Sequence, residues 1–334
     1  MSNLSQIVAD IKKGVFSPVY FLCGEEPYYI DEITDLIEAK ALTEDEKAFN
    51  QTVVYGKDVV IDDLISTAKR FPMMAERQVV IVREAQHILS KVAQLESYVE
   101  NPMQSTVLVF CCKYKKLDAR TKFAKIVKKT GVVFESKKLY ENQIPDWIIS
   151  TLSKAKYQIE PKAAFMLVEF LGNDLSKIKL ELKKLSISVP EGTLITPQVI
   201  EEHIGISKDF NVFELRGAIG NKDILRANRI ANYFGQNPKA HPNVLTIGML
   251  NSFFTQLLTY HGLKDKSKGS VAKALRVNPF FVDDYVTAAK NYPMRKVSQV
   301  IGLLREFDLK TKGVGAVSLA PSDVLKEMLF KILH

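Results

Sequence analysis

A glycine at the end of an apolar run is the first place in this chain where the residue types could do chemistry. The run Pro18–Cys23 predicts a buried strand, and Gly24 opens the turn before a predicted helix. A phosphate-binding loop at such a place needs the pattern G-x-x-x-x-G-K-[ST], in which backbone amides cradle phosphates and a lysine neutralises them. Tyr29, Ile30 and Asp31 stand where glycine, lysine and serine or threonine are needed. The pattern therefore predicts a degenerate nucleotide site.

The second element of a nucleotide site fails in the same way. An ATPase needs Asp-Glu after such a strand, with the aspartate holding magnesium, whereas the apolar run Val79–Val82 is followed by Arg83 and Glu84. An arginine cannot ligate a cation, and Glu84 is better explained as an acid at the start of a helix. The cysteines and histidines show no zinc-ligand spacing, and no nucleophile motif supports a catalytic triad. We therefore expect no cofactor, no metal site and no intrinsic enzymatic activity.

A short connection further along the chain contains apolar residues where polar ones are usual. Between a helix predicted over Ile61–Arg70 and a strand predicted from Gln78, the connection includes Phe71, Pro72, Met73 and Met74. Loops lie on the surface, so apolar side chains there indicate a binding partner. Methionine suits such a contact because it has three rotatable bonds and a polarizable sulfur. A methionine pair can also fill the core beneath a helix, and both interpretations stay open at this point.

The net charge of +8 is concentrated in one segment, Lys113–Lys138, which has ten basic residues against Asp118 and Glu135. A localised basic stripe suits contact with a phosphate backbone. A solvated outer helix face explains it equally well, since lysines commonly keep such faces soluble. The candidate DNA-contact residues are Lys113, Lys115, Lys116, Arg120, Lys122, Lys125, Lys128 and Lys129.

The elements that must position these residues change in type along the chain. Short apolar strands alternate with helical patterns up to Tyr140, which predicts a parallel sheet covered on both faces. After Tyr140 the strand signal disappears and only helices are predicted, with a candidate domain boundary at Ile206–Phe210. The fold class is thus α/β plus all-α. The predicted strands are Pro18–Cys23, Gln51–Tyr55, Gln78–Val82, Thr106–Cys112 and Gly131–Phe134, and the helices between them are Tyr28–Lys40, Ile61–Arg70 and Asp118–Lys129.

The bulk composition limits the class of protein and its compartment. The chain has 334 residues, 46% of them hydrophobic and 25% charged, which suits two or three ordinary globular domains. No apolar run reaches the roughly 18 residues typical of a membrane span, and the first residues lack the apolar core of a signal peptide. Cys23, Cys111 and Cys112 lie in apolar runs and indicate a reducing compartment. These features predict a cytoplasmic protein without membrane contact.

Five motifs occur in order along nearly the whole chain. Each motif alone is weak evidence for a protein family, but the five together are more specific. They are Pro18–Glu26, Phe71–Ala85, Gly172–Asp174 with Glu181–Leu185, Ala272–Pro279, and Asp308–Lys310 with Gly313. In order and spacing the chain resembles the family of delta subunits of the bacterial DNA polymerase III clamp loader. The resemblance implies a RecA-like domain of the AAA+ type without ATPase activity over residues 1–140, a helical lid over 141–207 and a helical collar over 208–334.

The resemblance also implies partners. Delta subunits of this family bind the sliding clamp, the beta subunit, beside one subunit interface and favour the open ring, which is loaded onto primed DNA in replication. Their clamp-binding residues lie in the helix-to-strand connection, which here maps to Phe71, Pro72, Met73 and Met74, with methionines where many relatives carry an aromatic residue or leucine. The collar would join the other loader subunits, primer-template DNA would be contacted within the assembly, and the complex would have DNA-directed DNA polymerase activity.

Two other functions are compatible with parts of the sequence. An active AAA+ ATPase with unusual motifs would bind nucleotide, although Tyr29, Ile30 and Arg83 argue against it. An autonomous DNA-binding or scaffold protein would show DNA affinity of its own and no contact with a clamp. Titrations with nucleotide and with a sliding clamp separate these alternatives.

Overall fold

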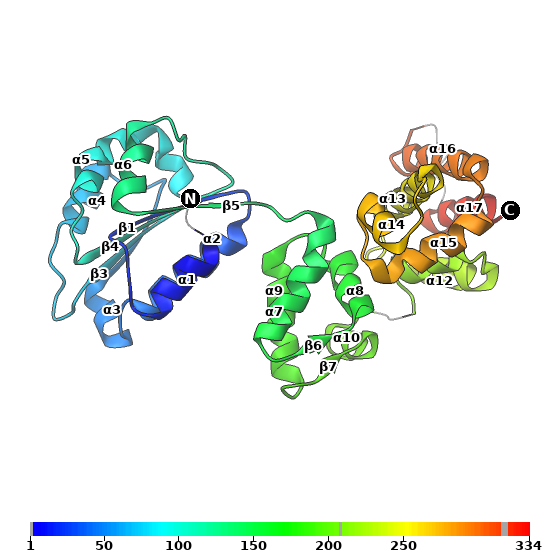
Figure 1. The fold of residues 1–334 in the computed structure, drawn as a ribbon, viewed down its shortest axis with the longest axis horizontal. Helices are drawn as coiled ribbons and strands as arrows, with labels where there is room; N and C mark the ends of the chain where they lie inside the picture. Colours follow the sequence, from blue (N-terminus) through cyan, green and yellow to red (C-terminus); the bar gives the residue numbers. More distant parts are fainter. Residues whose placement is uncertain (1–2, 207–208, 315–319) are drawn as a thin grey trace. The chain divides into compact units, whose positions relative to one another are not determined.

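The computed structural model describes residues 3–206, 209–314 and 320–334. The chain divides into two compact units, Met1–Leu139 and Tyr140–His334, and Figure 1 shows their elements coloured along the sequence. The boundary predicted between lid and collar, at residues 207 and 208, lies outside the described residues, so the division into three domains stays a prediction. None of the described helices is both long and apolar enough to cross a membrane.

A five-stranded parallel sheet forms the centre of the first unit. Its strands are β1 (Val19–Gly24), β2 (Gln51–Tyr55), β3 (Gln78–Arg83), β4 (Thr106–Lys113) and β5 (Val132–Ser136). They lie in the order β2-β3-β4-β1-β5, and every neighbouring pair is parallel. The three central strands are buried along nearly their whole length, which explains their unbroken apolar sequence. The predicted parallel sheet is confirmed.

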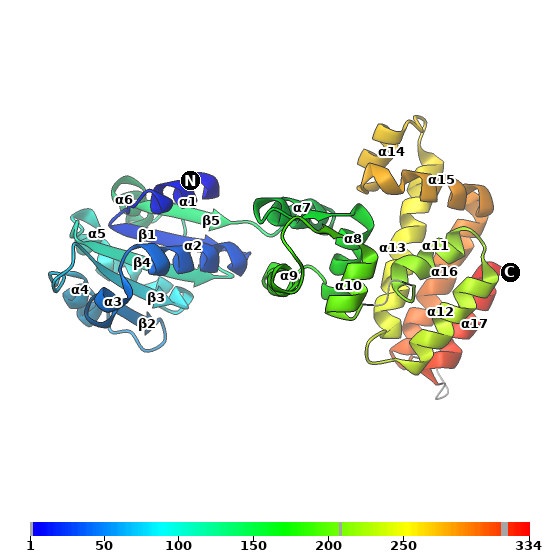
Figure 2. The same ribbon diagram turned by 90° about the horizontal axis from the view of Figure 1, so that it is seen from below.

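Helices cover both faces of this sheet. They are α1 (Leu4–Lys12), α2 (Pro27–Lys40), α3 (Glu44–Asn50), α4 (Ile61–Ala68), the 3-10 helix η1 (Ala85–Leu95), α5 (Glu96–Glu100) and α6 (Lys122–Thr130). Because side chains alternate along a strand, Tyr20 and Leu22 of β1 pack with α1 and α2, whereas Phe21 and Cys23 pack with α4, η1 and α6. Figure 2 shows α1 and α2 together on one side of the sheet. Gly24, Arg83 and Lys113 lie at the carboxyl ends of β1, β3 and β4, whereas the connection that holds Phe71–Met74 leads into the amino end of β3.

The second unit begins with a helical group that also holds a very small sheet. Its elements are the 3-10 helix η2 (Glu141–Gln143), α7 (Ile144–Lys154), β6 (Gln158–Ile159), α8 (Pro161–Leu171), α9 (Leu175–Ser188), β7 (Leu194–Ile195) and α10 (Pro197–Ile204). The expectation that strands end at Tyr140 is wrong, because β6 and β7 pair in parallel. Strands of two residues are too short to show an alternating pattern.

Helices alone make up the described remainder of the second unit. They are α11 (Val212–Gly220), α12 (Ile224–Gln236), α13 (Asn243–Gly262), α14 (Lys268–Leu275), the 3-10 helix η3 (Pro279–Phe281), α15 (Val282–Asn291), α16 (Met294–Thr311) and α17 (Pro321–Leu333). Large rings fill their core, among them Phe254, Tyr292 and Phe307, each with no measurable exposed surface. The predicted order of an α/β part followed by a mainly helical part is confirmed.

Candidate functional site

The turn after β1 is too short to wrap a phosphate group. β1 ends at Gly24 and α2 begins at Pro27, so only Glu25 and Glu26 connect them, whereas a phosphate loop places several residues between strand and helix. Glu26 is the N-cap of α2, and its Oε1 accepts a hydrogen bond from the Tyr28 N–H at 3.2 Å. A carboxylate therefore occupies the helix N-terminus at which an anion would bind.

The backbone amides of this turn already donate hydrogen bonds within the protein. The Gly24 N–H donates to the Lys115 carbonyl oxygen at 2.9 Å, and the Glu25 N–H donates to the Ser136 carbonyl oxygen at 3.1 Å. The Glu26 N–H donates to Ser136 Oγ at 3.1 Å. A phosphate loop binds its ligand through such amides, so here the donors that a phosphate requires are committed to β5 and to the segment after β4.

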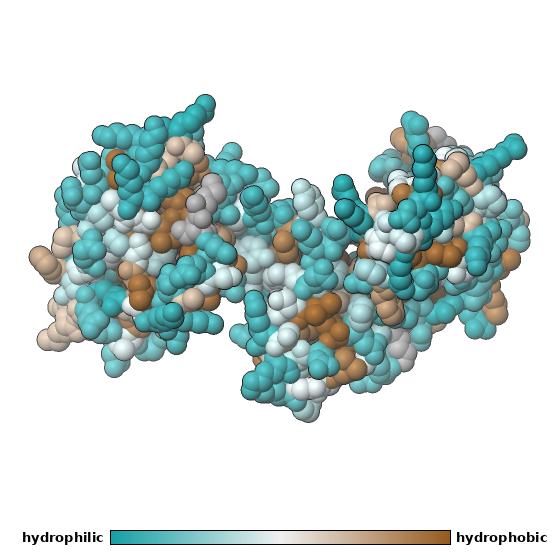
Figure 3. All heavy atoms as spheres, in the orientation of Figure 1, coloured by the Kyte–Doolittle hydropathy of each residue, from teal (hydrophilic) through white to brown (hydrophobic). Residues whose placement is uncertain are grey.

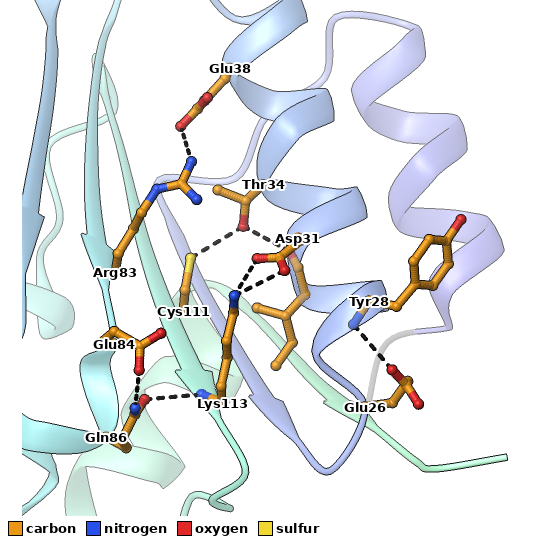
Figure 4. Close-up of polar contacts among 11 residues, drawn as sticks. Glu26, Tyr28, Asp31, Thr34, Glu38, Arg83, Glu84, Gln86, Cys111 and Lys113 are labelled. Atoms are coloured by element: carbon orange, nitrogen blue, oxygen red, sulfur yellow. Dashed lines mark hydrogen bonds and ion pairs between the residues drawn. The ribbon is translucent and has the colours of Figure 1, made fainter. Parts of the chain in front are cut away.

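Ion pairs engage two basic side chains near this turn (Figure 4). Lys113 Nζ lies 2.8 Å from Asp31 Oδ1, and Arg83 Nη2 lies 2.9 Å from Glu38 Oε1. Ile30, which stands in place of the phosphate-binding lysine, is fully buried among the residues beneath α2. Lys113 and Arg83 are thus paired with carboxylates of α2.

The carboxylates of α2 also add negative charge beside the turn after β1. Burial, together with the charges of Asp31 and Glu38, raises the pKa of Asp35. Tyr29, which stands where the phosphate loop has glycine, packs edge-on against Tyr28, with ring centroids 5.2 Å apart. A nucleotide phosphate would therefore meet negative charge rather than the positive charge that it needs.

Glu84 has a structural position, as expected for an acid before a helix. It precedes η1 with φ at +53°, and its carboxylate accepts a hydrogen bond from Gln86 Nε2. Gln86 Oε1 in turn accepts a hydrogen bond from the Lys113 N–H at 3.1 Å, which joins the end of β3 to the end of β4 (Figure 4). Glu84 and Gln86 therefore link these two strand ends through side-chain hydrogen bonds.

We predict that the chain does not bind ATP. A labelled ATP analogue with Mg²⁺, titrated up to about 1 mM, is expected to give no saturable signal, because the amides of the turn at Gly24 and the side chains of Lys113 and Arg83 already have partners. Fluorescence anisotropy measures this directly, and excess unlabelled ATP separates specific binding from adsorption. Stoichiometric binding that unlabelled ATP displaces would return the active ATPase as the better interpretation.

The connection between α4 and β3, residues 69–77, exposes its apolar side chains. Phe71, Met73 and Met74 are 81%, 58% and 101% exposed, and Pro72 is half-buried. Figure 3 shows pale brown side chains at the left edge of the first unit, where the light-blue connection into β3 projects in Figure 1. The interpretation of the two methionines as core filler is wrong. We call residues Phe71–Met74 the apolar loop.

A buried amide side chain holds the first part of this connection. Gln78, at the start of β3, has its Nε2 2.6 Å from the Arg70 carbonyl oxygen and 3.1 Å from the Thr67 carbonyl oxygen. The last carbonyl groups of a helix have no partner within the helix, so Gln78 satisfies acceptors at the end of α4. The apolar loop therefore leaves a fixed helix end rather than a frayed one.

A second buried amide, Asn50, was missed by the sequence reasoning. Its side chain binds both backbone polar groups of Met73, a residue 23 positions away. A contact at that separation leaves no local pattern in the sequence. The only signal nearby is the T-x-x-E pattern from Thr43 to Glu46, which marks the start of the short helix α3 that carries Asn50.

The helix of the basic segment begins later than its sequence pattern predicts. A start at Asp118 was expected, but α6 begins at Lys122 with Thr121 as N-cap, whose Oγ1 accepts a hydrogen bond from the Ala124 N–H. The Asp118 carboxylate instead accepts hydrogen bonds from Arg120, and these lower the pKa of Asp118 to about 2. The side chain of Asp118 therefore serves the turn before the helix rather than the helix itself.

The eight candidate DNA-contact residues divide into two groups. Lys113, Lys116, Arg120 and Lys122 each form an ion pair within the first unit, with Asp31, Glu135, Asp118 and Glu96 respectively. Within the described residues, the other four form no ion pair and are exposed; they are Lys115, Lys125, Lys128 and Lys129. The last three lie on the face of α6 opposite the buried Phe123 and Val127. The structure thus leaves a smaller basic face than the sequence predicts.

Comparisons with known proteins agree along the chain. Residues 20–137 match the family model described as DNA polymerase III, delta subunit, and residues 209–318 match the model of the C-terminal domain of the same subunit. The DNA polymerase III subunit delta of Bacillus subtilis (strain 168) is 27% identical over 313 residues, 90% of each chain. A probable DNA polymerase III subunit delta of Aquifex aeolicus (strain VF5) is 21% identical over 264 residues, 75% of this chain and 72% of that one.

A solved structure shares the fold. The Bacillus subtilis DNA clamp loader delta protein superposes with a TM-score of 0.57 and 24% identity, covering 99% of both chains. This likeness and the order of the parallel sheet confirm the predicted fold class, an α/β domain with a parallel sheet followed by helical parts.

Proposed function

Because the chain belongs to the family of DNA polymerase III delta subunits, we propose that it binds the sliding clamp through the apolar loop and favours opening of the clamp ring for loading onto primed DNA. The contact would be made by Phe71, Pro72, Met73 and Met74. The observation that supports this most directly is the exposure of three large apolar side chains on a connection anchored by buried amides.

The physical argument concerns the cost of leaving these side chains in water. Apolar surface gains free energy when a partner covers it, and full burial of one methionine is worth about 1.5–3 kcal/mol. Met73 and Met74 together could contribute about 3–6 kcal/mol before the entropy of association is subtracted. A contact of that strength suits a partner that must be bound and released in each loading cycle. Pro72 restricts the backbone before binding, which lowers the ordering cost.

The helices after residue 208 are proposed to join the other loader subunits. Leu225 of α12 and Phe330 of α17 are 64% and 65% exposed, and these two helices pack against each other. Exposed apolar residues on packed helices support a contact with neighbouring chains. In this proposal the chain is a subunit without ATPase activity of its own, within a complex that has DNA-directed DNA polymerase activity.

The test is a titration of the full chain against the sliding clamp of the same organism. Isothermal titration calorimetry is expected to show saturable binding with a defined stoichiometry. An autonomous DNA-binding or scaffold protein predicts no heat of binding with the clamp but saturable binding to DNA alone. Absence of clamp binding at micromolar concentrations would reject the proposed function.

Contact with primer-template DNA is a further part of the proposal, and it concerns the exposed face of α6. Each phosphate contact that is lost reduces the slope of log K against log salt by about 0.9. Reversing the charge of Lys125, Lys128 and Lys129 with glutamate is therefore expected to flatten that slope by about 2–3 for the assembled loader. Binding of labelled primer-template DNA at several salt concentrations measures the change.

Three exposed lysines on the opposite face of the sheet provide the matched control. Lys12 and Lys40 are the last residues of α1 and α2, Lys13 follows Lys12, and none of the three forms an ion pair within the described residues. Their reversal changes the net charge by the same amount as the α6 variant. If both variants flatten the slope equally, the effect comes from net charge alone, and the face of α6 is a solvated surface.

A further inference from the structure

The buried side chain of Asn50 binds the backbone of Met73, which belongs to the apolar loop. Its Oδ1 accepts a hydrogen bond from the Met73 N–H at 2.6 Å, and its Nδ2 donates to the Met73 carbonyl oxygen at 3.0 Å. Asn50 is only 4% exposed. One buried side chain thus satisfies both backbone polar groups of a residue whose own side chain points to solvent.

The residue after Met73 has an unfavourable backbone conformation. Met74 has φ at +53°, a left-handed conformation that costs roughly as much as one hydrogen bond in residues other than glycine. Such a conformation persists when its surroundings determine it. One of these bonds ends at the carbonyl of the peptide group that joins Met73 to Met74, and the other ends at the N–H of the peptide group before it. Asn50 therefore holds both sides of the residue directly before the strained Met74.

Asn50 is itself held in place by the helix that carries it. α3 has only seven residues, and a capping box fixes its start, with the Thr43 N–H donating to Glu46 Oε2 at 2.8 Å. Asn50 Nδ2 also donates to the Glu46 carbonyl oxygen at 3.1 Å. The side chain therefore has a second anchor besides Met73, and its direction does not depend on the loop alone.

We propose that Asn50 is a positioning residue for clamp binding, which orders Met73 and Met74 in their exposed conformation before the partner arrives. This inference rests on the proposed function. Ordering a loop before binding removes that cost from the association step. Without Asn50, the apolar side chains would remain, but the clamp would have to select one of many loop conformations.

The test combines Asn50→Ala with replacement of the two methionines in a double-mutant cycle. In the wild-type background, Asn50→Ala is expected to raise the Kd for the clamp about tenfold, the effect of ordering roughly one backbone residue. In the Met73→Ala, Met74→Ala background the same change is expected to leave Kd within about twofold, because the two side chains that Asn50 positions have been removed. Asn50→Asp keeps the acceptor but removes the donor, and it should weaken binding as Asn50→Ala does.

A readout without the clamp keeps the test independent of folding defects. Hydrogen exchange at the Met73 amide is expected to accelerate about tenfold in Asn50→Ala, while exchange in β3 stays unchanged. Asn228→Ala is the control, because Asn228 makes the same bond to the carbonyl four residues before it, on α12. An equal loss of clamp affinity in both methionine backgrounds, or none in either, would overturn the inference. If the methionine replacements themselves leave Kd unchanged, the proposed function fails instead.

Discussion

Replacing Met73 and Met74 together with alanine is expected to raise the Kd for the sliding clamp by about 100-fold. Alanine keeps the Cβ of each residue, so the double variant loses most of the apolar surface that two methionines would bury, worth roughly 3 kcal/mol. The side chains are 58% and 101% exposed in the free chain, so their removal leaves no cavity behind. Calorimetric titration of the full chain with the clamp measures the change.

The control for this prediction separates loss of the contact from loss of the fold. Met294, on α16 of the second unit, is 47% exposed, and Met294→Ala removes a similar side chain from a different surface. Both variants are expected to unfold at the wild-type temperature. A Kd that is unchanged in the Met73→Ala, Met74→Ala variant would remove the apolar loop from the clamp contact.

Gly24→Ala is expected to lower the free energy of unfolding of the first unit by about 2–6 kcal/mol, the sum of backbone strain and overpacking. Gly24 has φ at +129°, which side chains other than glycine rarely adopt. A Cβ at this position would lie 2.6 Å from the Ser136 backbone nitrogen and closer still to its carbonyl oxygen. Gly24 and Ser136 are register partners on β1 and β5, so neither backbone can move without breaking the pair.

Hydrogen exchange of peptides from β1 and β5, followed by mass spectrometry, measures the stability of this unit. The single tryptophan, Trp147, lies in the second unit and would report on that unit instead. Gly14→Ala is the matched control, since φ is +79° but no atom lies within 4 Å of the added Cβ. Gly14→Ala should lower the free energy of unfolding by only about 1–2 kcal/mol. Equal losses in the two variants would show that close packing against Ser136 is not the cause.

The fold was predictable where the sequence shows a period or a buried run. Val79–Val82 is apolar throughout because β3 is covered on both faces, and the helix predicted over Tyr28–Lys40 is α2, which begins one residue earlier. A helix was expected to start at Glu84, and η1 begins directly after it, whereas the two-residue strands β6 and β7 were not predicted. They depend on contacts with distant segments rather than on a local pattern.

The residue types of the candidate site could be predicted from the sequence, but the buried side chain that holds them in place could not. Pro72 and the two methionines could be identified because apolar residues in a surface connection are unusual. Asn50 could not, because an asparagine at a helix end is common and its partner is remote in sequence. Counting charges likewise overestimated the basic face, since a count does not show that Lys113 and Lys116 are paired with carboxylates.

The buried thiols of the sheet have a practical consequence. All three cysteines, Cys23, Cys111 and Cys112, are buried on β1 and β4, and burial raises the pKa of Cys111 to about 11. Maleimide reagents react with accessible thiolates, so these sulfur atoms should stay unmodified at neutral pH. A Met74→Cys variant would then place one reactive sulfhydryl at the tip of the apolar loop. A fluorophore attached there could follow the loop in the otherwise unaltered chain, without first replacing any native cysteine.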